Sequence, residues 1–405
     1  MTLQKPQHEI DYCRALLAYL ISQGFNHQQA AEKLPEYMGK LPPARIARYV
    51  DTARKRRWLE TRFNEEQFPP AVLENIREDA HHTPWIDLEK NLQTLSGGVL
   101  KELWVFESSD KANPGNDQAE WDWQMRNFAG NSAWLILQLL LRSQSGIGLG
   151  WGKTIANAIL EVANRVKSEK RARPRRRKKI TIIPTVCTPP STIPDDLAIS
   201  STKLARTLSE AITGTWDDVL SLENISPVLP PGLEGERRSG FFQANLIRGH
   251  YKAIFGDPDG PQNETPLIRT IDTILTSAGS FHVDTYYMKE LVEIGKVTKK
   301  ELTKLSLGDI GGVLIPGNAV ENDPKNKARF VEILNLWTGP KLEDYQNVAR
   351  RAAANDAEDA PAGVILCALN GNKANIVLNL VRLQAVSMLV IDCHLANSLQ
   401  RLLSM

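Results

Sequence analysis

The sequence lacks the features of secreted, membrane-spanning and metal-binding proteins. Its four cysteines are far apart and form no C-x-x-C pair, which predicts reduced thiols rather than a disulfide framework or a zinc site. The longest apolar run, residues 133–141, is well short of the roughly 18 residues that a membrane helix needs. Residues 4–11 are polar, unlike a signal peptide. We therefore expect a cytoplasmic protein with no membrane segment, no metal and no cofactor.

The chain also lacks a strong net charge, but its charge is unevenly distributed. Its 405 residues carry a formal net charge of +2, and this length suits two or three domains. Residues 1–62 contain 11 basic and 6 acidic side chains, so the remainder is slightly acidic. A basic terminal module on a nearly neutral body predicts a nucleic-acid partner for that module.

The glycine-rich segment 146–154 precedes a helical pattern. Glycines let the backbone approach a ligand closely, and the N–H groups at the start of the next helix favour an anion. Lys153 adds a charge and Thr154 a hydroxyl, so we predict a bound phosphate. A nucleotide-binding P-loop would require glycine where Ile147 stands, which argues against an ATPase or GTPase.

Three short helices are predicted in the basic module, over residues 9–22, 27–34 and 43–57. The third presents basic side chains opposite its apolar face, as in a helix-turn-helix whose recognition helix enters the major groove of DNA. A small helical dimerisation module with a solvated basic face is the alternative.

The remaining chain alternates predicted strands and helices from about residue 85 onward. This pattern predicts an α/β fold with a doubly wound, mostly parallel sheet that binds ligands at the carboxyl ends of its strands. We expect a linker over 63–84, loops over 109–122 and 214–265, a helix over 130–142 and a helix capped by Ser201 or Thr202. The basic run 167–179 is predicted to be a surface loop or an auxiliary phosphate contact.

Several motifs, in order, resemble those of SorC/DeoR-type sugar-responsive transcriptional regulators. The segment 146–154 resembles their glycine-rich loop, and segments 23–34 and 44–50 resemble their helix-turn-helix. Residues 308–312 resemble their G-D-I-x-G signature. Residues 370–373 and 391–394 resemble their G-x-x-K and T-D-E segments, with Cys393 in place of the usual acidic residue.

The resemblance implies a helix-turn-helix at 1–62 and, at 85–405, an effector domain with a Rossmann-like fold of the sugar-phosphate isomerase type. It implies three partners: operator DNA, a small phosphorylated sugar as effector, and further copies of the chain in a homodimer or homotetramer. The residues assigned to the effector are Gly148, Gly150, Trp151, Gly152, Lys153, Thr154, Asp309, Lys373 and Asp392. Those assigned to DNA are Gln28, Arg45, Arg48, Tyr49 and Arg56.

Two other functions fit the same residues. A sugar-phosphate isomerase or deaminase would use Asp309 or Asp392 as general base, but the basic N-terminal module has no purpose in such an enzyme. Residues 271–279 resemble a family strand that ends in a more glycine-rich loop, where this chain has Ser277. A regulator that has lost its effector would explain this departure and the one at Cys393. We expect a regulator that is not an enzyme.

Overall fold

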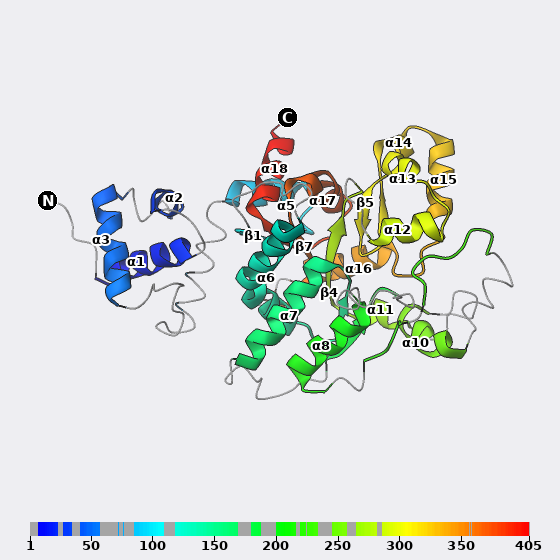
Figure 1. The fold of residues 1–405 in the computed structure, drawn as a ribbon, viewed down its shortest axis with the longest axis horizontal. Coiled ribbons are helices and arrows are strands. Elements are labelled where there is room, and N and C mark those ends of the chain that lie inside the picture. Colours follow the sequence, from blue (N-terminus) through cyan, green and yellow to red (C-terminus); the bar gives the residue numbers. More distant parts are fainter. Residues whose placement is uncertain are drawn as a thin grey trace.

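The computed structural model describes most of the chain and shows how its elements are arranged (Figure 1). The described residues are 7–22, 27–34, 41–56, 72, 76, 85–108, 118–168, 180–187, 200–215, 219–223, 225–233, 245–256, 265–281, 286–355, 357 and 359–404. Residues 169–179 of the basic run and most of the predicted linker lie outside these ranges.

The N-terminal module consists of α1 (Gln7–Ser22), α2 (His27–Glu32) and α3 (Pro43–Lys55), at the positions that the sequence predicted. Leu16, Leu17 and Leu20 of α1 are buried against Ile46 and other apolar residues of α2 and α3. Ile76 is also fully buried in this core. The module therefore uses residues beyond the predicted boundary at residue 62.

The body is built on a parallel sheet of six strands in the order β1-β8-β7-β4-β2-β3. All five neighbouring pairs are parallel, so the carboxyl ends of these strands lie at one edge. The strands are β1 (Glu102–Phe106), β2 (Gly146–Leu149), β3 (Thr181–Pro184), β4 (Thr273–Gly279), β7 (Gly363–Ala368) and β8 (Met388–Asp392). The predicted α/β class with a mostly parallel sheet is confirmed.

Two apolar cores cover the two faces of this sheet, because successive residues of a strand point to opposite sides. In β8, Leu389 and Ile391 belong to one core, whereas Met388 and Val390 belong to the other. The helices against the second face are α6 (Gln118–Leu141), α7 (Lys153–Ser168) and α8 (Ser201–Thr213). The first core includes α5 (Ile86–Leu95), α16 (Leu342–Ala353), α17 (Ala374–Arg382) and α18 (Cys393–Leu403).

A hairpin and several helices extend the body beyond β4. Strand β5 (Ser306–Ile310) pairs antiparallel with the end of β4 and with β6 (Val313–Pro316). The other elements are α10 (Asn245–Phe255), α11 (Leu267–Thr270), α12 (Tyr286–Glu293), α13 (Lys299–Leu305), α14 (Asn318–Glu321), α15 (Pro324–Leu334) and the short 3₁₀ helix η5 (Gly371–Lys373).

Three sequence predictions about individual elements are wrong. Helix α6 begins at Gln118, twelve residues before the predicted start, because a polar amphipathic first half precedes its apolar second half. Ser200 caps α8 by accepting the Lys203 N–H, whereas Ser201 donates to the Leu149 carbonyl at 2.6 Å. Helix α10 lies within the predicted loop 214–265.

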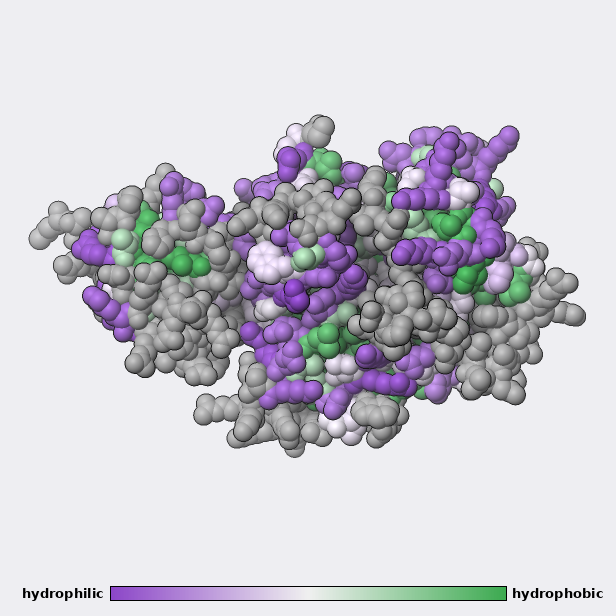
Figure 2. Space-filling model, in the orientation of Figure 1, coloured by the Kyte–Doolittle hydropathy of each residue, from purple (hydrophilic) through white to green (hydrophobic). Residues whose placement is uncertain are grey.

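Hydrophilic residues dominate the face of the molecule in Figure 2, with hydrophobic areas over α7 and beside α12. Exposed apolar side chains of these helices include Leu160 and Val292, at 47% and 38% exposure. No helix in the described part of the chain is long and apolar enough to cross a bilayer.

Replacing Ile76 by alanine tests whether this residue belongs to the N-terminal core. We expect Ile76→Ala to reduce the free energy of unfolding of the helical module by about 2–5 kcal/mol, because a fully buried side chain leaves a cavity. Ile86→Ala is the matched control, since Ile86 is 41% exposed on α5, and should cost far less. Urea unfolding followed by circular dichroism measures both; equal losses would contradict the assignment.

Candidate functional site

The predicted ligand residues lie at the carboxyl edge of the parallel sheet or on the hairpin beside it. Strand β2 leads through Gly150 and Gly152 to α7, and β7 leads to η5, which ends at Lys373. Asp392 is the last residue of β8. Strand order places β7 between β8 and β4, and β4 next to β2. Segments more than 200 residues apart in sequence therefore meet at one edge, where open α/β sheets bind ligands.

The glycines of the loop allow close packing between neighbouring strands. A Cβ on Gly148 would lie 2.7 Å from the Ile271 Cδ1 atom, and one on Gly150 would lie 2.8 Å from the Thr276 Oγ1 atom. The Gly150 N–H donates to the Leu275 carbonyl at 2.9 Å. Gly148 and Gly150 thus have a packing role in the protein itself, whether or not a ligand also approaches them.

Gly152 ends the loop and starts α7. Its φ of +107° lies in the region that favours glycine, and its carbonyl accepts the Ala156 N–H at 2.9 Å. Lys153 is exposed at the first position of the helix, and Thr154 behind it is 8% exposed. The first N–H groups of a helix have no acceptor within the helix, so this end favours an anion.

Trp151 packs beneath the loop rather than lying open to solvent. Its side chain is 7% exposed, and its ring centroid lies 6.5 Å from those of both Tyr287 and Trp337. Trp151, which the resemblance assigned to the effector, thus packs inside the protein, and this arrangement favours a packing role over stacking on a sugar ring.

Asp309 is a buried acid on β5, beside the turn to β6. Its Oδ1 atom accepts the Gly312 N–H at 2.8 Å. Burial raises the pKa of Asp309 to about 6, although the Gly312 hydrogen bond and the charge of Lys373 oppose this shift. Burial raises the pKa of the Tyr287 hydroxyl, and the charge of Asp309 raises it further. Asp309 can therefore exchange a proton near neutral pH, but it lies largely out of solvent.

The charges of two carboxylates act on Lys373. Burial lowers its pKa, while the charges of Asp392 and Asp309 act in the opposite direction. The side chain is half-buried at the end of η5. This position leaves a cation near the strand ends that suits a phosphate or a sugar hydroxyl.

Asp392 has a structural role that the sequence did not indicate. It caps α18 by accepting the Leu395 N–H at 3.0 Å, and the same Oδ1 atom accepts the Asn370 N–H at 2.9 Å. Its Oδ2 atom accepts from the Ser108 hydroxyl at 2.8 Å. Burial raises the pKa of Asp392, and these three hydrogen bonds oppose the shift. Asp392 therefore positions the segment that leads to Lys373, rather than offering a free carboxylate.

Sequence reasoning missed Glu107, Ser108 and Thr276 at this edge. Glu107 and Ser108 directly follow the apolar strand β1, so a polar pair at the end of a predicted strand is the signal that could have identified them. Thr276 lies within β4, and no local pattern separates it from the neighbouring residues. Only its position beside Gly150 relates it to the site.

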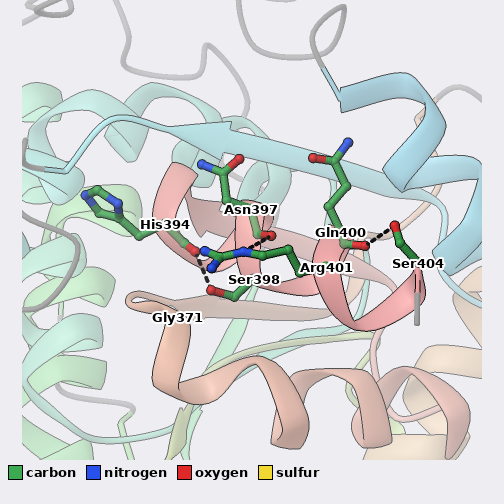
Figure 3. Close-up of a pocket in the computed structure, with 7 residues that line it drawn as sticks. All are labelled: Gly371, His394, Asn397, Ser398, Gln400, Arg401 and Ser404. Atoms are coloured by element: carbon green, nitrogen blue, oxygen red, sulfur yellow. Dashed lines mark hydrogen bonds between the residues drawn. The ribbon is translucent and has the colours of Figure 1, made fainter.

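A polar hollow of about 700 Å³ lies beside the strand edge, along the outer face of α18 (Figure 3). Its lining residues are Gly371, His394, Asn397, Ser398, Gln400, Arg401 and Ser404. Gly371 belongs to the same turn as Lys373, so the hollow adjoins the candidate site without containing its predicted residues.

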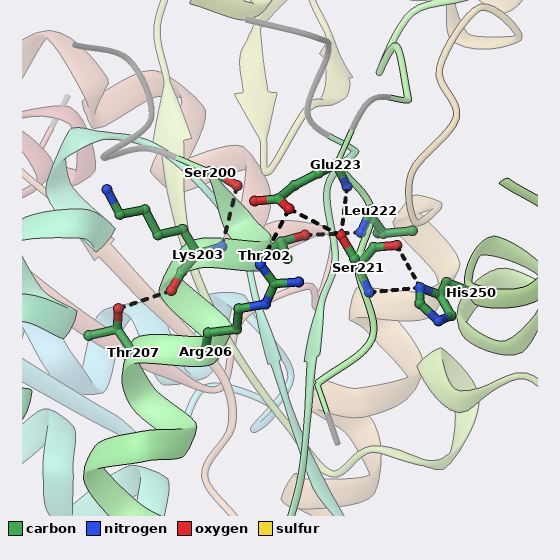
Figure 4. Close-up of polar contacts among 9 residues, drawn as sticks. All are labelled: Ser200, Thr202, Lys203, Arg206, Thr207, Ser221, Leu222, Glu223 and His250. Atoms are coloured by element: carbon green, nitrogen blue, oxygen red, sulfur yellow. Dashed lines mark hydrogen bonds and ion pairs between the residues drawn. The ribbon is translucent and has the colours of Figure 1, made fainter. Parts of the chain in front are cut away.

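A second group of polar contacts holds the segment 219–223 against α8 and α10 (Figure 4). The Thr202 hydroxyl accepts the Leu222 N–H at 3.0 Å, and Arg206 pairs with Glu223 at 3.4 Å. The Ser221 N–H donates to His250 Nδ1 at 3.1 Å. The polar groups of this cluster therefore bond to one another, which indicates that they hold the segment 219–223 in place.

The predicted DNA-binding residues of the N-terminal module differ in their surroundings. Arg56 pairs with Asp11 at 3.1 Å, the Arg14 guanidinium lies 5.0 Å from the Tyr49 ring centroid, and Gln28 donates to Glu32 at 3.0 Å. Arg45 and Arg48 are exposed on α3. No carboxylate in the described ranges pairs with either of these two arginines.

Comparison with solved structures supports the fold. A transcriptional regulator from Streptococcus pneumoniae TIGR4 matches 80% of this chain and 97% of its own length, with 16% identity and a TM-score of 0.50. The full-length sorbitol operon regulator SorC from Klebsiella pneumoniae matches 97% of this chain and 99% of its own length, with 14% identity and a TM-score of 0.49.

A DeoR family transcriptional regulator from Listeria monocytogenes covers 78% of this chain and 99% of its own, at 17% identity and a TM-score of 0.49. No family model and no curated protein matches the sequence. The match to the Streptococcus pneumoniae structure shows that this chain has a similar α/β fold.

Replacing Asp309 by asparagine tests the raised pKa. The folded carboxyl has a pKa of about 6 against 3.8 ordinarily, so the folded chain holds an extra proton between these values. The contribution of Asp309 to stability should therefore be fully present below about pH 4 and be lost, by roughly 3 kcal/mol, as the pH rises through 6. Asp309→Asn should remove this part of the pH dependence, because the amide cannot ionise.

Urea unfolding at a series of pH values measures this effect. Asp323→Asn is the control for loss of a carboxylate, since Asp323 caps α15 at the surface. If Asp309→Asn kept the full slope between pH 4 and 7, Asp309 would not be the titrating group.

Proposed function

We propose that this protein is a DNA-binding transcriptional regulator whose C-terminal domain senses a phosphorylated sugar or a related metabolite. The observation that carries the proposal is the meeting of α7's N-terminus, Lys373 and the strand ends at one sheet edge, in a chain that also has a basic helical module. Neither part requires a metal or a cofactor in this proposal.

The DNA-binding half is supported by the surface of α3. Arg45 and Arg48 are one helical turn apart and exposed. A guanidinium can make two parallel hydrogen bonds to a phosphate or to the edge of a guanine base. Gln28, Tyr49 and Arg56 already have partners in the module, so they would contribute to DNA binding by exchanging or sharing those contacts. A homodimer or homotetramer would match a palindromic operator, because protein and DNA would share a two-fold axis.

The effector half is supported by charge at the strand ends. The N-terminus of α7 and Lys153 would hold the phosphate, and Lys373 would contact the phosphate or a hydroxyl. Asp309 would accept a hydroxyl after a local rearrangement, whereas Asp392 acts through the Asn370 turn. Such a ligand alters DNA binding if it binds one arrangement of the protein better than another.

Removing one exposed arginine of α3 should weaken DNA binding. We expect Arg45→Ala or Arg48→Ala to reduce affinity by about tenfold or more, since a lost side-chain contact to DNA costs on the order of 1–3 kcal/mol. Fluorescence anisotropy on DNA from upstream of the gene, with scrambled DNA for comparison, measures the change. Lys325→Ala on α15, an exposed lysine of the body, is the control and should bind as the unaltered chain does.

A sequence preference that survives moderate salt is the result that supports the proposal. Equal binding to both DNAs, lost as salt rises, would reveal only a basic surface. Unchanged affinity in both arginine variants would place the DNA interface elsewhere.

Removing the charge at the start of α7 should weaken binding of a sugar phosphate. Ligands that bind the folded state raise its melting temperature, so we expect glucose 6-phosphate, fructose 6-phosphate or a related compound to stabilise the chain. Lys153→Ala should reduce that shift by about half or more, since roughly 1 kcal/mol of ligand affinity depends on such a contact. Gly152→Asp should abolish it.

Lys167→Ala is the matched control, because Lys167 is an exposed lysine near the other end of the same helix. Differential scanning fluorimetry with inorganic phosphate and free sugars as comparison ligands measures the shifts. If Lys153→Ala and Lys167→Ala behaved alike, the phosphate would not lie at the start of α7.

A sugar-phosphate isomerase or deaminase is the second candidate, favoured by one observation. A buried acid with a pKa of about 6 is typical of acid–base catalysts. Turnover separates the candidates, because an enzyme converts a sugar phosphate that a regulator merely binds. Conversion that disappears in Asp309→Asn would establish the enzyme.

A further inference from the structure

Lys33, directly after α2, links the N-terminal module to the body. Its Nζ atom lies 5.7 Å from the centroid of the Trp85 ring, within the range of a cation–π interaction. Trp85 is the residue immediately before α5. Figure 1 shows α2 on the side of the module that faces the body. The contact therefore joins the second helix of the module to the first described helix of the body.

The same ammonium group acts on Glu107, at the carboxyl end of β1. Burial raises the pKa of Glu107, and the hydrogen bond from Cys393 and the charge of Lys33 oppose that shift. The Cys393 thiol donates to the Glu107 Oε2 atom at 3.2 Å. His394 and Asp392 also act on this carboxyl, in opposite directions. Glu107 is thus a carboxylate at the edge of the body on which a cation of the N-terminal module acts electrostatically.

Glu107 is one residue from the hydrogen bonds that shape the candidate effector site. The adjacent Ser108 donates to Asp392 at 2.8 Å, and Asp392 accepts the Asn370 N–H at 2.9 Å. Asn370 has a φ of +79°, so its backbone is held in a conformation that few non-glycine residues adopt. Three residues later comes Lys373. A short series of contacts therefore connects Lys33 with the cation proposed to hold the ligand.

We infer that Lys33 is a positioning residue that fastens the N-terminal module to the effector site, through the Trp85 ring and the Glu107 carboxylate. A ligand that moves the Asn370 turn shifts Asp392, Ser108 and Glu107 with it, and so alters the surface on which Lys33 rests. Lys33 directly follows α2, which is only six residues long. A displacement of Lys33 therefore also displaces Gln28 in α2 and the neighbouring helix α3. The contact is independent of the proposed function; its regulatory role rests on that function.

Three variants test the contact itself. Lys33→Met keeps the apolar stem on Trp85 and removes the charge, Glu107→Gln keeps the shape and removes the carboxylate, and the third variant combines both. Hydrogen–deuterium exchange of the full chain, followed in α2 and in residues 85–108, reports whether the two parts hold each other. We expect exchange to become about threefold faster or more in each single variant. The double variant should match Lys33→Met, because the Glu107 carboxylate has no further effect once the Lys33 charge is gone.

Lys55→Met is the matched control, since Lys55 is an exposed lysine at the end of α3 in the same module, and its exchange in these segments should equal that of the unaltered chain. Unchanged exchange in Lys33→Met would overturn the inference. Effects of the two single variants that add in the double variant would also overturn it, because additive effects indicate independent contacts.

DNA affinity of the same variants tests the regulatory role. We expect all three variants to change the affinity for DNA, measured by fluorescence anisotropy, in the same direction and by about threefold or more. If exchange responds but affinity does not, the contact is structural and the regulatory role is overturned. If no variant and not even the unaltered chain prefers any DNA, the proposed function fails, while the exchange result still decides the contact.

Discussion

The carboxyl edge of the sheet depends on one buried carboxylate, that of Asp392. It is fully buried, and a buried charge is costly unless hydrogen bonds replace its water. Those bonds come from Ser108 after β1, Asn370 after β7 and Leu395 in α18. Three separate parts of the chain are therefore placed relative to one another by a single side chain. The turn that carries Lys373 has its geometry because Asn370 is held in this way.

Close packing between strands imposes the second constraint on the site. Gly150 lies against Thr276, and Gly311 lies beside both Thr276 and the Tyr345 hydroxyl. Trp151 fills the space beneath the loop together with Tyr287 and Trp337. The glycine-rich loop is therefore closely packed on its inner side, and Lys153 at the start of α7 is exposed.

The two modules of the chain use charge in different ways. In the body, the charges of Asp309 and Asp392 act on Lys373, and low polarity makes each charge affect the others strongly. In the N-terminal module, Arg14 and Arg56 both pair with Asp11, whereas Arg45 and Arg48 stay exposed. Lys33 lies where the modules meet, so it connects a buried set of charges with a solvated one.

The sequence alone determined the order of the elements and the α/β class, because these depend on local periodicity: apolar strands, amphipathic helices and glycine at turns. The glycine pattern before a helix indicated an anion-binding loop, whereas Asp309, Lys373 and Asp392 were assigned by the resemblance of their segments to family motifs, and their binding role remains a prediction. The start of α6 was mispredicted because its first half is polar and resembles a loop in the sequence. The cap of α8 was mispredicted because three adjacent hydroxyl residues, 200–202, are equally suitable caps by sequence.

Only the tertiary structure decided what each of these side chains contacts. Asp392 joins Asn370 and Leu395 to Ser108, which is 284 residues away in the chain, and Trp151 packs against Tyr287 and Trp337, which are also distant in the chain. Ile76 and Lys33 likewise gain their roles from segments that the sequence pattern leaves separate. Burial and pairing are properties of the folded neighbourhood, and no local pattern in a single sequence encodes which distant residues will form it.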